Sequence, residues 1–264
     1  MIEPATPRNE ENRLEALRAL GLLDSLPEKV FDDIVALTRL VQEVPTALIS
    51  LVDSDRQWFK AAAGLDAHET PRSVSFCGHA IHQPDVFVVP DAPLDPRFHE
   101  NPLVVGNPHI RFYAGFPLTL PGGYRIGTLC ALSPVPREEF GAEGQAKLRL
   151  LGSMVLDAIE LRTARSQLDR ERAALRRHAA ALHALDVPVA FADADERLEI
   201  HNAAFALLCV GGDPAGRRVD VALGLSPAEW SASLQAGLVE SKSLSFHRVA
   251  GGIVLVGVPP VGGG

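Results

Sequence analysis

The order of apolar and polar positions predicts two helices and then a hairpin at the start of the chain. Residues 9–23 place leucines at helical spacing, with arginine and glutamate on the other face. A second helix is expected over residues 27–42, because Pro27 suits the first turn of a helix. Its expected inward positions are Val30, Phe31, Ile34, Leu37 and Val41. Residues 46–52 and 57–63 have the character of paired strands around a polar turn. Helices followed by a hairpin favour an α+β domain with a largely antiparallel sheet.

The most specialised stretch of the sequence covers residues 72–132. Its pattern predicts a short helix at 75–82, a strand at 86–89 and a closing hairpin of strands 110–120 and 124–132. Between the strand and the hairpin lies a connection, residues 90–108, that is rich in aspartate, proline and asparagine. Connections of this length inside a compact domain are usually functional. We therefore expect a functional site near residues 90–108.

Residues 141–184 are predicted to form one long helix, because they contain no proline and, after Gly152, no glycine. A residue suited to a helix seam recurs every seven positions, at Met154, Leu161, Leu168, Leu175 and Leu182. The other seam position is poorer and holds Ala158, Arg165, Arg172 and Ala179. One interpretation is a parallel two-stranded coiled coil that makes the protein a homodimer through this helix. The other is a single long surface helix that packs on one side only.

The remaining residues predict a second, smaller α+β unit. Strands are expected at 187–193 and 197–201, followed by a helix from Asn202 and another over 230–239. A final hairpin is expected from strands 243–249 and 252–258, with its turn at 250–252.

Composition limits the classes of partner. The 25 Lys and Arg against 33 Asp and Glu give a formal charge of −8, which argues against nucleic-acid binding. No apolar run is long enough to span a membrane. Three cysteines far apart in the sequence do not form a disulfide framework, and they favour a reducing compartment. We therefore expect a cytoplasmic protein that binds neither nucleic acid nor membrane.

The first half of the chain resembles a bacterial GAF domain. The match rests on RSVSFCGHAI at 72–81, VPD at 89–91, DPRF at 95–98, NPLV at 101–104, IRFYAGFPL at 110–118 and GTLC at 127–130. The last part resembles a PAS domain through PVAFAD at 188–193 and IHNAAF at 200–205, where PAS domains often carry an asparagine at a helix start. The resemblance implies a GAF domain over 9–140 with an antiparallel sheet flanked by helices, a linker helix over 141–184 and a short PAS-like domain over 185–258. Similar GAF domains commonly precede histidine kinases and cyclic-di-nucleotide enzymes, so either is an expected partner.

The resemblance also implies that the connection at 90–108 folds over the sheet and closes a pocket. The candidate ligand-binding residues are Phe76, Cys77, His79, Asp91, Arg97, Phe98, Arg111, Phe112 and Tyr113. In one interpretation Arg97 or Arg111 binds an anion while the aromatic side chains form the walls. In the other, these arginines form ion pairs that lock the loop, Cys77 packs as a small apolar side chain and His79 makes a local hydrogen bond.

Sequence motifs for catalysis are missing: there is no phosphate-binding glycine loop, no Gly-x-Ser-x-Gly and no HExxH. Cys77, His79 and His82 lack the second pair of ligands that a structural zinc site needs. No cofactor is assigned; haem and bilin stay as disfavoured alternatives, because a lone histidine or cysteine is no signature for either. The expected function is non-catalytic sensing, with the GAF domain binding a small molecule or acting as a dimerisation module and relaying through the helix. The alternatives are a ligand-free scaffold and a haem- or thiol-based redox or gas sensor.

Overall fold

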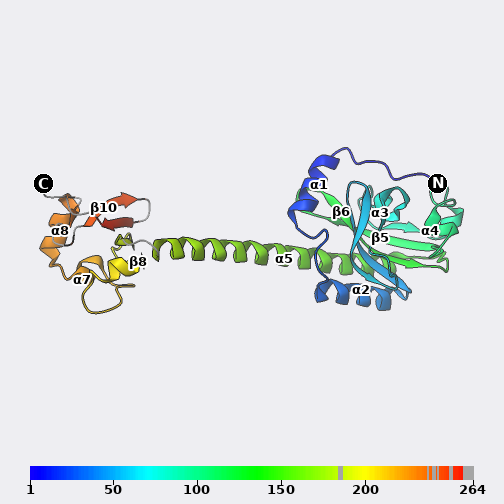
Figure 1. The fold of residues 1–264 in the computed structure, drawn as a ribbon. Coiled ribbons are helices and arrows are strands. Elements are labelled where there is room, and N and C mark those ends of the chain that lie inside the picture. Colours follow the sequence, from blue (N-terminus) through cyan, green and yellow to red (C-terminus); the bar gives the residue numbers. More distant parts are fainter. Residues whose placement is uncertain (184–186, 237, 240–241, 243, 250–251, 258–264) are drawn as a thin grey trace. The chain divides into compact units, whose positions relative to one another are not determined.

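The computed structural model describes residues 1–183, 187–236, 238–239, 242, 244–249 and 252–257. The chain divides into two units, Met1–Ser166 and Gln167–Gly264, and helix α5 (Ala142–His183) contributes residues to both (Figure 1). No helix in the described part of the chain is long and apolar enough to cross a membrane.

The first unit is built on one six-stranded sheet in the order β3-β2-β1-β6-β5-β4, with every neighbouring pair antiparallel. Its strands are β1 (Thr46–Val52), β2 (Arg56–Ala63), β3 (Glu69–Pro71), β4 (Phe87–Val89), β5 (Phe112–Thr119) and β6 (Arg125–Ser133). The predicted α+β class with an antiparallel sheet is confirmed. Residues 47–52 of β1 are all buried, which agrees with its continuous apolar sequence, because both faces of the sheet are covered.

Three helices pack on one face of this sheet: α1 (Glu10–Ala19), α2 (Lys29–Gln42) and the first half of α5. The α5 side chains in this core are Leu148, Leu151, Val155 and Ile159. Gly152 also faces the sheet, and a Cβ at this position would overlap the ring of Phe116 on β5. The absent side chain therefore lets the helix lie directly against that ring.

Two sequence expectations for these helices are wrong. Val30 and Leu37 of α2 are 47% and 39% exposed. The side of α2 that faces the sheet is formed instead by the buried residues Phe31, Ile34, Val35, Thr38 and Gln42. On α1, Arg13 shares the buried side with Leu17 and is 1% exposed, whereas arginine was expected on the outer face. Arg13 can be buried because Glu10 pairs with its guanidinium at 2.7 Å.

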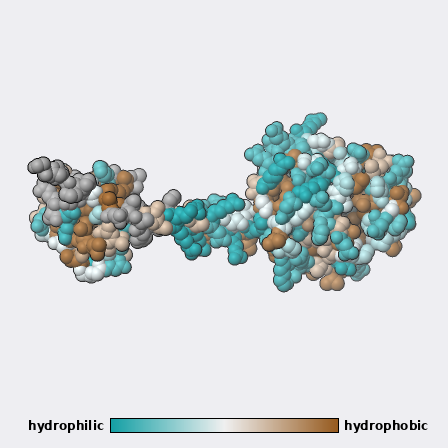
Figure 2. All heavy atoms as spheres, viewed as in Figure 1, coloured by the Kyte–Doolittle hydropathy of each residue, from teal (hydrophilic) through white to brown (hydrophobic). Residues whose placement is uncertain are grey.

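The exposed apolar side chains of α2 meet others on α5. Val30 and Leu37 line a groove together with Met154 and Leu161, and these α5 residues are 41% and 72% exposed. In the view of Figure 2, the surface of α5 beyond its packed first half is mainly hydrophilic. The apolar positions of α5 therefore form a narrow stripe within a polar helix.

The other face of the sheet carries short helices and the connection after β4. These are η1 (Arg72–Val74), α3 (Phe76–Ala80), η2 (Ala92–Leu94) and α4 (Pro102–Val105). Aromatic rings fill the space beneath them: Phe76 stacks on Phe98 with ring centroids 4.0 Å apart and an 8° angle between planes. This second core is separate from the helix-side core, so the sheet is the middle of three layers.

The second unit has a five-stranded antiparallel sheet in the order β8-β7-β11-β10-β9. Its elements are β7 (Val189–Asp193), β8 (Leu198–His201), α6 (Ala203–Ala206), α7 (Val219–Leu223), α8 (Pro227–Ala236), β9 (Leu238–Val239), β10 (Leu244–Val249) and β11 (Gly252–Gly257). The predicted helix over 230–239 is wrong at its end, since α8 stops at Ala236 and residues 238–239 are a strand. The predicted final hairpin is present as β10 and β11, while residues 243, 250–251 and 258 lie outside the described residues.

Asn202 fixes the start of α6. Its side-chain oxygen accepts hydrogen bonds from the backbone N–H groups of Phe205 at 2.9 Å and Val189 at 3.0 Å. Its side-chain nitrogen donates to the carbonyl of Val187 at 2.7 Å. One buried side chain thus caps a helix and holds the first strand of the unit in place.

Candidate functional site: a cavity between the sheet and the 90–108 connection

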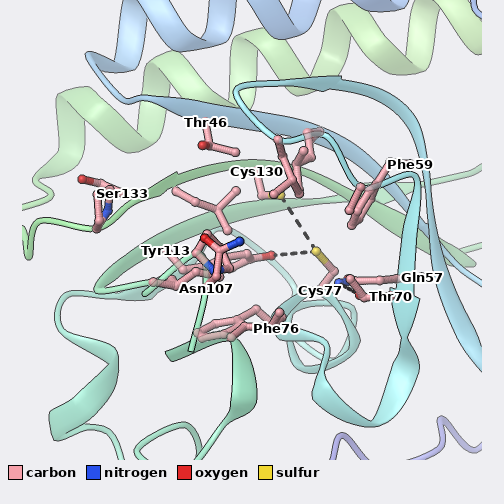
Figure 3. Close-up of a pocket in the computed structure, with 18 residues that line it drawn as sticks. Thr46, Gln57, Phe59, Thr70, Phe76, Cys77, Asn107, Tyr113, Cys130 and Ser133 are labelled. Carbon is pink, nitrogen blue, oxygen red and sulfur yellow. Dashed lines mark hydrogen bonds between the residues drawn. The ribbon is translucent and has the colours of Figure 1, made fainter. Parts of the chain in front are cut away.

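A cavity of about 160 Å³ lies between the connection at 90–108 and the face of the sheet that α3 covers. Strands β1, β2, β5 and β6 form its floor, and α3 forms one wall (Figure 3). The connection contributes Leu103, Asn107 and Pro108 to the opposite wall. The expectation that this connection folds over the sheet is therefore confirmed.

Polar side chains hold the walls in position. Ser75 caps α3 by accepting from the backbone N–H of Gly78 at 2.8 Å, and its hydroxyl donates to Gln57 of β2 at 2.5 Å. Asn101 caps α4, and its side-chain nitrogen donates to the carbonyl of Val74 at 2.9 Å. The bond from Asn101 to Val74 ties the connection to the segment that leads into α3, so a specific contact holds two walls of the cavity together.

Two cysteine thiols meet in the cavity. Cys77 of α3 and Cys130 of β6 have their sulfur atoms 3.9 Å apart, and both line the cavity. The Tyr113 hydroxyl donates to the Cys77 sulfur at 3.5 Å and lies 3.5 Å from the Thr128 hydroxyl. Figure 3 shows the side chains of Cys77 and Cys130 pointing toward each other across the space between α3 and β6.

Burial and hydrogen bonding set the pKa values of these groups. Burial raises the pKa of Cys130 well above its ordinary value, and the nearby Cys77 raises it further. Burial also acts against ionisation of Cys77, but hydrogen bonds from Cys130 and from neighbouring hydroxyl groups outweigh it and lower the pKa of Cys77 to about 6. Burial raises the pKa of Tyr113 as well. Of the two thiols, Cys77 is therefore the one whose ionisation the surroundings favour.

Three of the candidate residues, Phe76, Cys77 and Tyr113, line the cavity. Phe98 stands behind Phe76 as its stacking partner. Phe112 lies on the opposite face of β5, where its ring packs against Phe140 with centroids 5.2 Å apart. Its assignment to the pocket wall is wrong, because neighbouring residues of a strand point to opposite faces.

The charged candidates lie around the cavity instead of in it. Asp91 pairs with Arg111 and Asp95 with Arg97, both at 2.5 Å. These hydrogen bonds hold the pKa of each aspartate below its ordinary value. The ion pairs expected to lock the loop are therefore present, and neither guanidinium lines the cavity.

His79 is directed away from the cavity. Its ring contacts Phe98 edge-on at 5.0 Å between centroids, and its Nε2 lies 3.0 Å from the carbonyl oxygen of Ile2. Burial lowers the pKa of His79. The hydrogen bond expected for this histidine within its own helix-to-strand corner is therefore replaced by one to the N-terminal segment, 77 residues earlier in the chain.

Sequence reasoning missed Cys130 and the polar lining residues Gln57, Thr70, Asn107 and Ser133. A signal for Cys130 did exist: in the β5–β6 register Tyr113 lies opposite Leu132. Residues opposite each other in a hairpin share a face, and so do residues two apart in a strand. Placing Tyr113 in the pocket therefore places Cys130 there too.

In the described part of the chain, no group of three or more His, Cys, Asp or Glu side chains could hold a metal ion.

Comparisons with known proteins agree on the first unit. The family model described as "GAF domain" matches residues 26–162. A cyclic di-GMP phosphodiesterase of Pseudomonas aeruginosa is 41% identical over 169 residues, which are 64% of this chain and 29% of that enzyme. The chain thus spans less than a third of that relative's length.

Among solved structures, the GAF domain of an Acinetobacter phosphoenolpyruvate-protein phosphotransferase is 17% identical, with a TM-score of 0.42, covering 59% of this chain and 98% of that one. A free methionine-R-sulfoxide reductase of Neisseria meningitidis is 19% identical, with a TM-score of 0.43, covering 63% of this chain and 98% of that one. GAF domains are typical of sensory signalling proteins. Because the family model spans more than half of the 264 residues, this chain belongs to the GAF domain family.

Proposed function

We propose that this chain is the sensory part of a signalling system and that its cavity binds a small, uncharged and largely apolar molecule. The observation that carries this proposal is the partly open cavity beneath the 90–108 connection, with mainly apolar walls and a few polar atoms. Such a combination is the usual form of a small-molecule site.

The size and lining of the cavity limit the class of ligand. Its volume of about 160 Å³ is close to that of an engineered apolar cavity, about 150 Å³, that binds benzene. Apart from the ionisable thiols of Cys77 and Cys130, none of the described residues that line it has an acidic or basic side chain, and the polar groups include the Tyr113 hydroxyl and the Asn107 amide. A charged ligand would lose its hydration without a partner. The ligand class is therefore a molecule about the size of one aromatic ring, with one or two hydrogen-bonding atoms.

The same features disfavour haem and bilin. No histidine is present among the described residues that line the cavity, and His79 is held against Phe98. Sites for drug-sized ligands are commonly about 300–1,000 Å³, well above the volume found here. Purified protein is expected to be colourless, and a Soret band would contradict this part of the proposal.

Native mass spectrometry of gently purified protein tests the proposal directly. The wild-type protein is expected to retain a small molecule or to gain thermal stability with members of a fragment library. Ala67 lines the cavity, so Ala67→Leu should fill it and abolish both effects. Ala62→Leu, at an exposed position of the preceding strand β2, is the matched control and should bind like the wild type. If neither retained mass nor stabilisation is found for the wild type, the alternative of a ligand-free scaffold is favoured.

We further propose that α5 relays the signal through a homodimer. Met154 and Leu161 are 41% and 72% exposed, and Leu168, one heptad further, is 46% exposed. Burying each such side chain against a second copy would contribute roughly 1.5–3 kcal/mol. Leu161→Glu is expected to convert a dimer to a monomer in sedimentation experiments, whereas Ser153→Glu, on an exposed face of the same helix, should not. A monomeric wild-type protein at tens of micromolar would refute the dimeric relay.

The output is proposed to lie outside the described units. The Pseudomonas relative, named for cyclic di-GMP hydrolysis, supports a cyclic-di-nucleotide enzyme as the output partner, with a histidine kinase as the second candidate. The five-stranded sheet of the second unit and the asparagine cap at the start of α6 support a PAS-like unit over residues 185–258. The chain is proposed to have no catalytic output of its own. Hydrolysis of cyclic di-GMP by the purified chain would contradict this.

A further inference from the structure

The strongest unassigned feature is the pair of sulfur atoms inside the cavity. Cys77 and Cys130 come from different elements, are separated by 53 residues and have their sulfur atoms 3.9 Å apart. Both are nearly closed to bulk water, at 2% and 0% exposure, yet both border the cavity. A reactant small enough to enter the cavity would therefore meet two thiols at once.

The groups around the two thiols favour reaction at Cys77. Hydroxyl groups approach from three strands: Ser50 of β1, Tyr113 of β5 and Thr128 of β6. Cys130 and Tyr113 are the titratable groups that face Cys77 among the described residues. Hydrogen bonds to the Cys77 sulfur stabilise its thiolate, and the thiolate is the nucleophilic form of cysteine.

We propose that Cys77 and Cys130 form a dithiol that reduces a small hydroperoxide entering the cavity and becomes a reversible disulfide. The Cys77 thiolate attacks one peroxide oxygen and breaks the O–O bond. The other oxygen leaves and takes up the proton that Cys77 released, so hydrogen peroxide gives water and an alkyl hydroperoxide gives an alcohol. Cys77 is left as a sulfenic acid.

The second step consumes the Cys130 thiol. Its sulfur attacks the sulfenic sulfur of Cys77, the S–S bond forms and the S–O bond breaks. The oxygen leaves as water with the Cys130 proton. In total, two thiols lose two electrons and one hydroperoxide gains them, so the only co-reactant is the hydroperoxide.

The movement that this step needs is small. The sulfur atoms must close from 3.9 Å to about 2.05 Å, the length of a disulfide bond. The product would join α3 to β6 and remove both S–H groups from the cavity wall. The reaction does not depend on the ligand proposed above, because it requires access to the cavity and nothing else.

The third cysteine provides an internal control. Cys209 belongs to the second unit and is partly exposed, and burial raises its pKa. Native wild-type protein is treated with hydrogen peroxide, quenched in acid, unfolded and alkylated with N-ethylmaleimide. We expect one alkylated thiol instead of three, and peptide mapping should find Cys77 linked to Cys130. Dithiothreitol should restore three alkylated thiols.

Variants separate the two steps. Cys209→Ser should form the same disulfide, whereas Cys130→Ser should stop at a sulfenic acid on Cys77 that dimedone traps. Three remaining thiols after peroxide treatment of the wild type, or a disulfide that includes Cys209, would overturn the proposal. The wild-type measurement decides this even if a variant does not fold.

Ala67→Leu should slow oxidation by limiting access to the cavity. If peroxide oxidises the pair but no fragment binds, the dithiol stands and the small-molecule proposal fails.

Discussion

Replacing Glu10 by glutamine should destabilise the first unit by about 3 kcal/mol at pH 7. The Glu10 carboxylate accepts hydrogen bonds from Arg13 at 2.7 and 2.8 Å and from Arg72 at 2.5 Å, and so joins α1 to η1. The side chains of Arg13 and Arg72 are only 2% and 10% exposed. In the variant, two buried cations lose their counter-charge, and removing one partner of a buried ion pair typically costs about 3–5 kcal/mol.

The pKa of Glu10 gives a second, independent magnitude. Burial opposes its ionisation, but the hydrogen bonds from Arg13 and Arg72 outweigh burial and lower the pKa of Glu10 from 4.5 to about 2. At about 1.36 kcal/mol per pH unit, this corresponds to roughly 3 kcal/mol. Because the pKa is lower in the folded state, this stability is present above pH 4.5. It is lost as the pH falls from about 5 toward 2.

Each unit contains one of the two tryptophans, so unfolding of the first unit can be followed alone. In a Trp230→Phe background, Trp58 fluorescence during urea denaturation reports the free energy of unfolding at pH 7 and at pH 3. The parent should lose much of its advantage over Glu10→Gln at the lower pH. Glu11→Gln, at an exposed neighbouring position, is the control and should match its parent. A difference of less than 1 kcal/mol between Glu10→Gln and its parent at pH 7 would refute the reasoning.

Three further changes should have effects that the packing predicts. Gly115→Ala should destabilise the first unit by about 1–3 kcal/mol in the same denaturation assay, because its Cβ would overlap the Tyr113 hydroxyl. Lys60→Met should cost about 2–4 kcal/mol by the same measurement, since the buried ammonium donates to Glu28 at 2.7 Å and to two further oxygen atoms nearby. Asn202→Ala should lower the stability of the second unit by about 2 kcal/mol, read by Trp230 fluorescence, because a helix cap and a strand contact are lost together. No change in any of these transitions would contradict the corresponding contact.

Local pattern was sufficient to predict the longer strands, because each is a short apolar run between turn residues, and their observed bounds lie within about two residues of those expected. The short strands β3 and β9 were not predicted, because two or three residues carry too little pattern. It was not sufficient to orient every side chain. Phe112 and Tyr113 are both large and aromatic, and only the alternation along β5 separates the helix-side core from the cavity. Arg13 was expected on the outer face because charge usually marks solvent, whereas here a carboxylate three residues away permits its burial.

The site was harder to predict than the fold because it depends on residues far apart in the chain. The motif at 72–81 drew attention to Cys77 and to the neighbouring His79, which faces away from the cavity. The partner that lies beside Cys77 is Cys130 on β6, a central strand of the sheet that comes 53 residues later in the chain. Nothing in the local sequence of either cysteine indicates the other, and only the register of the hairpin does so.

The contact between Gly152 and Phe116 has a mechanical consequence. The ring of Phe116 occupies the place where a side chain of α5 would otherwise be, so the strand packs directly against the backbone of the helix at residue 152. A larger residue at position 152 would have to displace the Phe116 ring or move the helix away from the strand. Phe116 follows Gly115, which lies against the Tyr113 hydroxyl on the cavity side of the same strand. Adjacent residues of β5 therefore contact the cavity side of the sheet and α5, with no intervening residue between the two contacts.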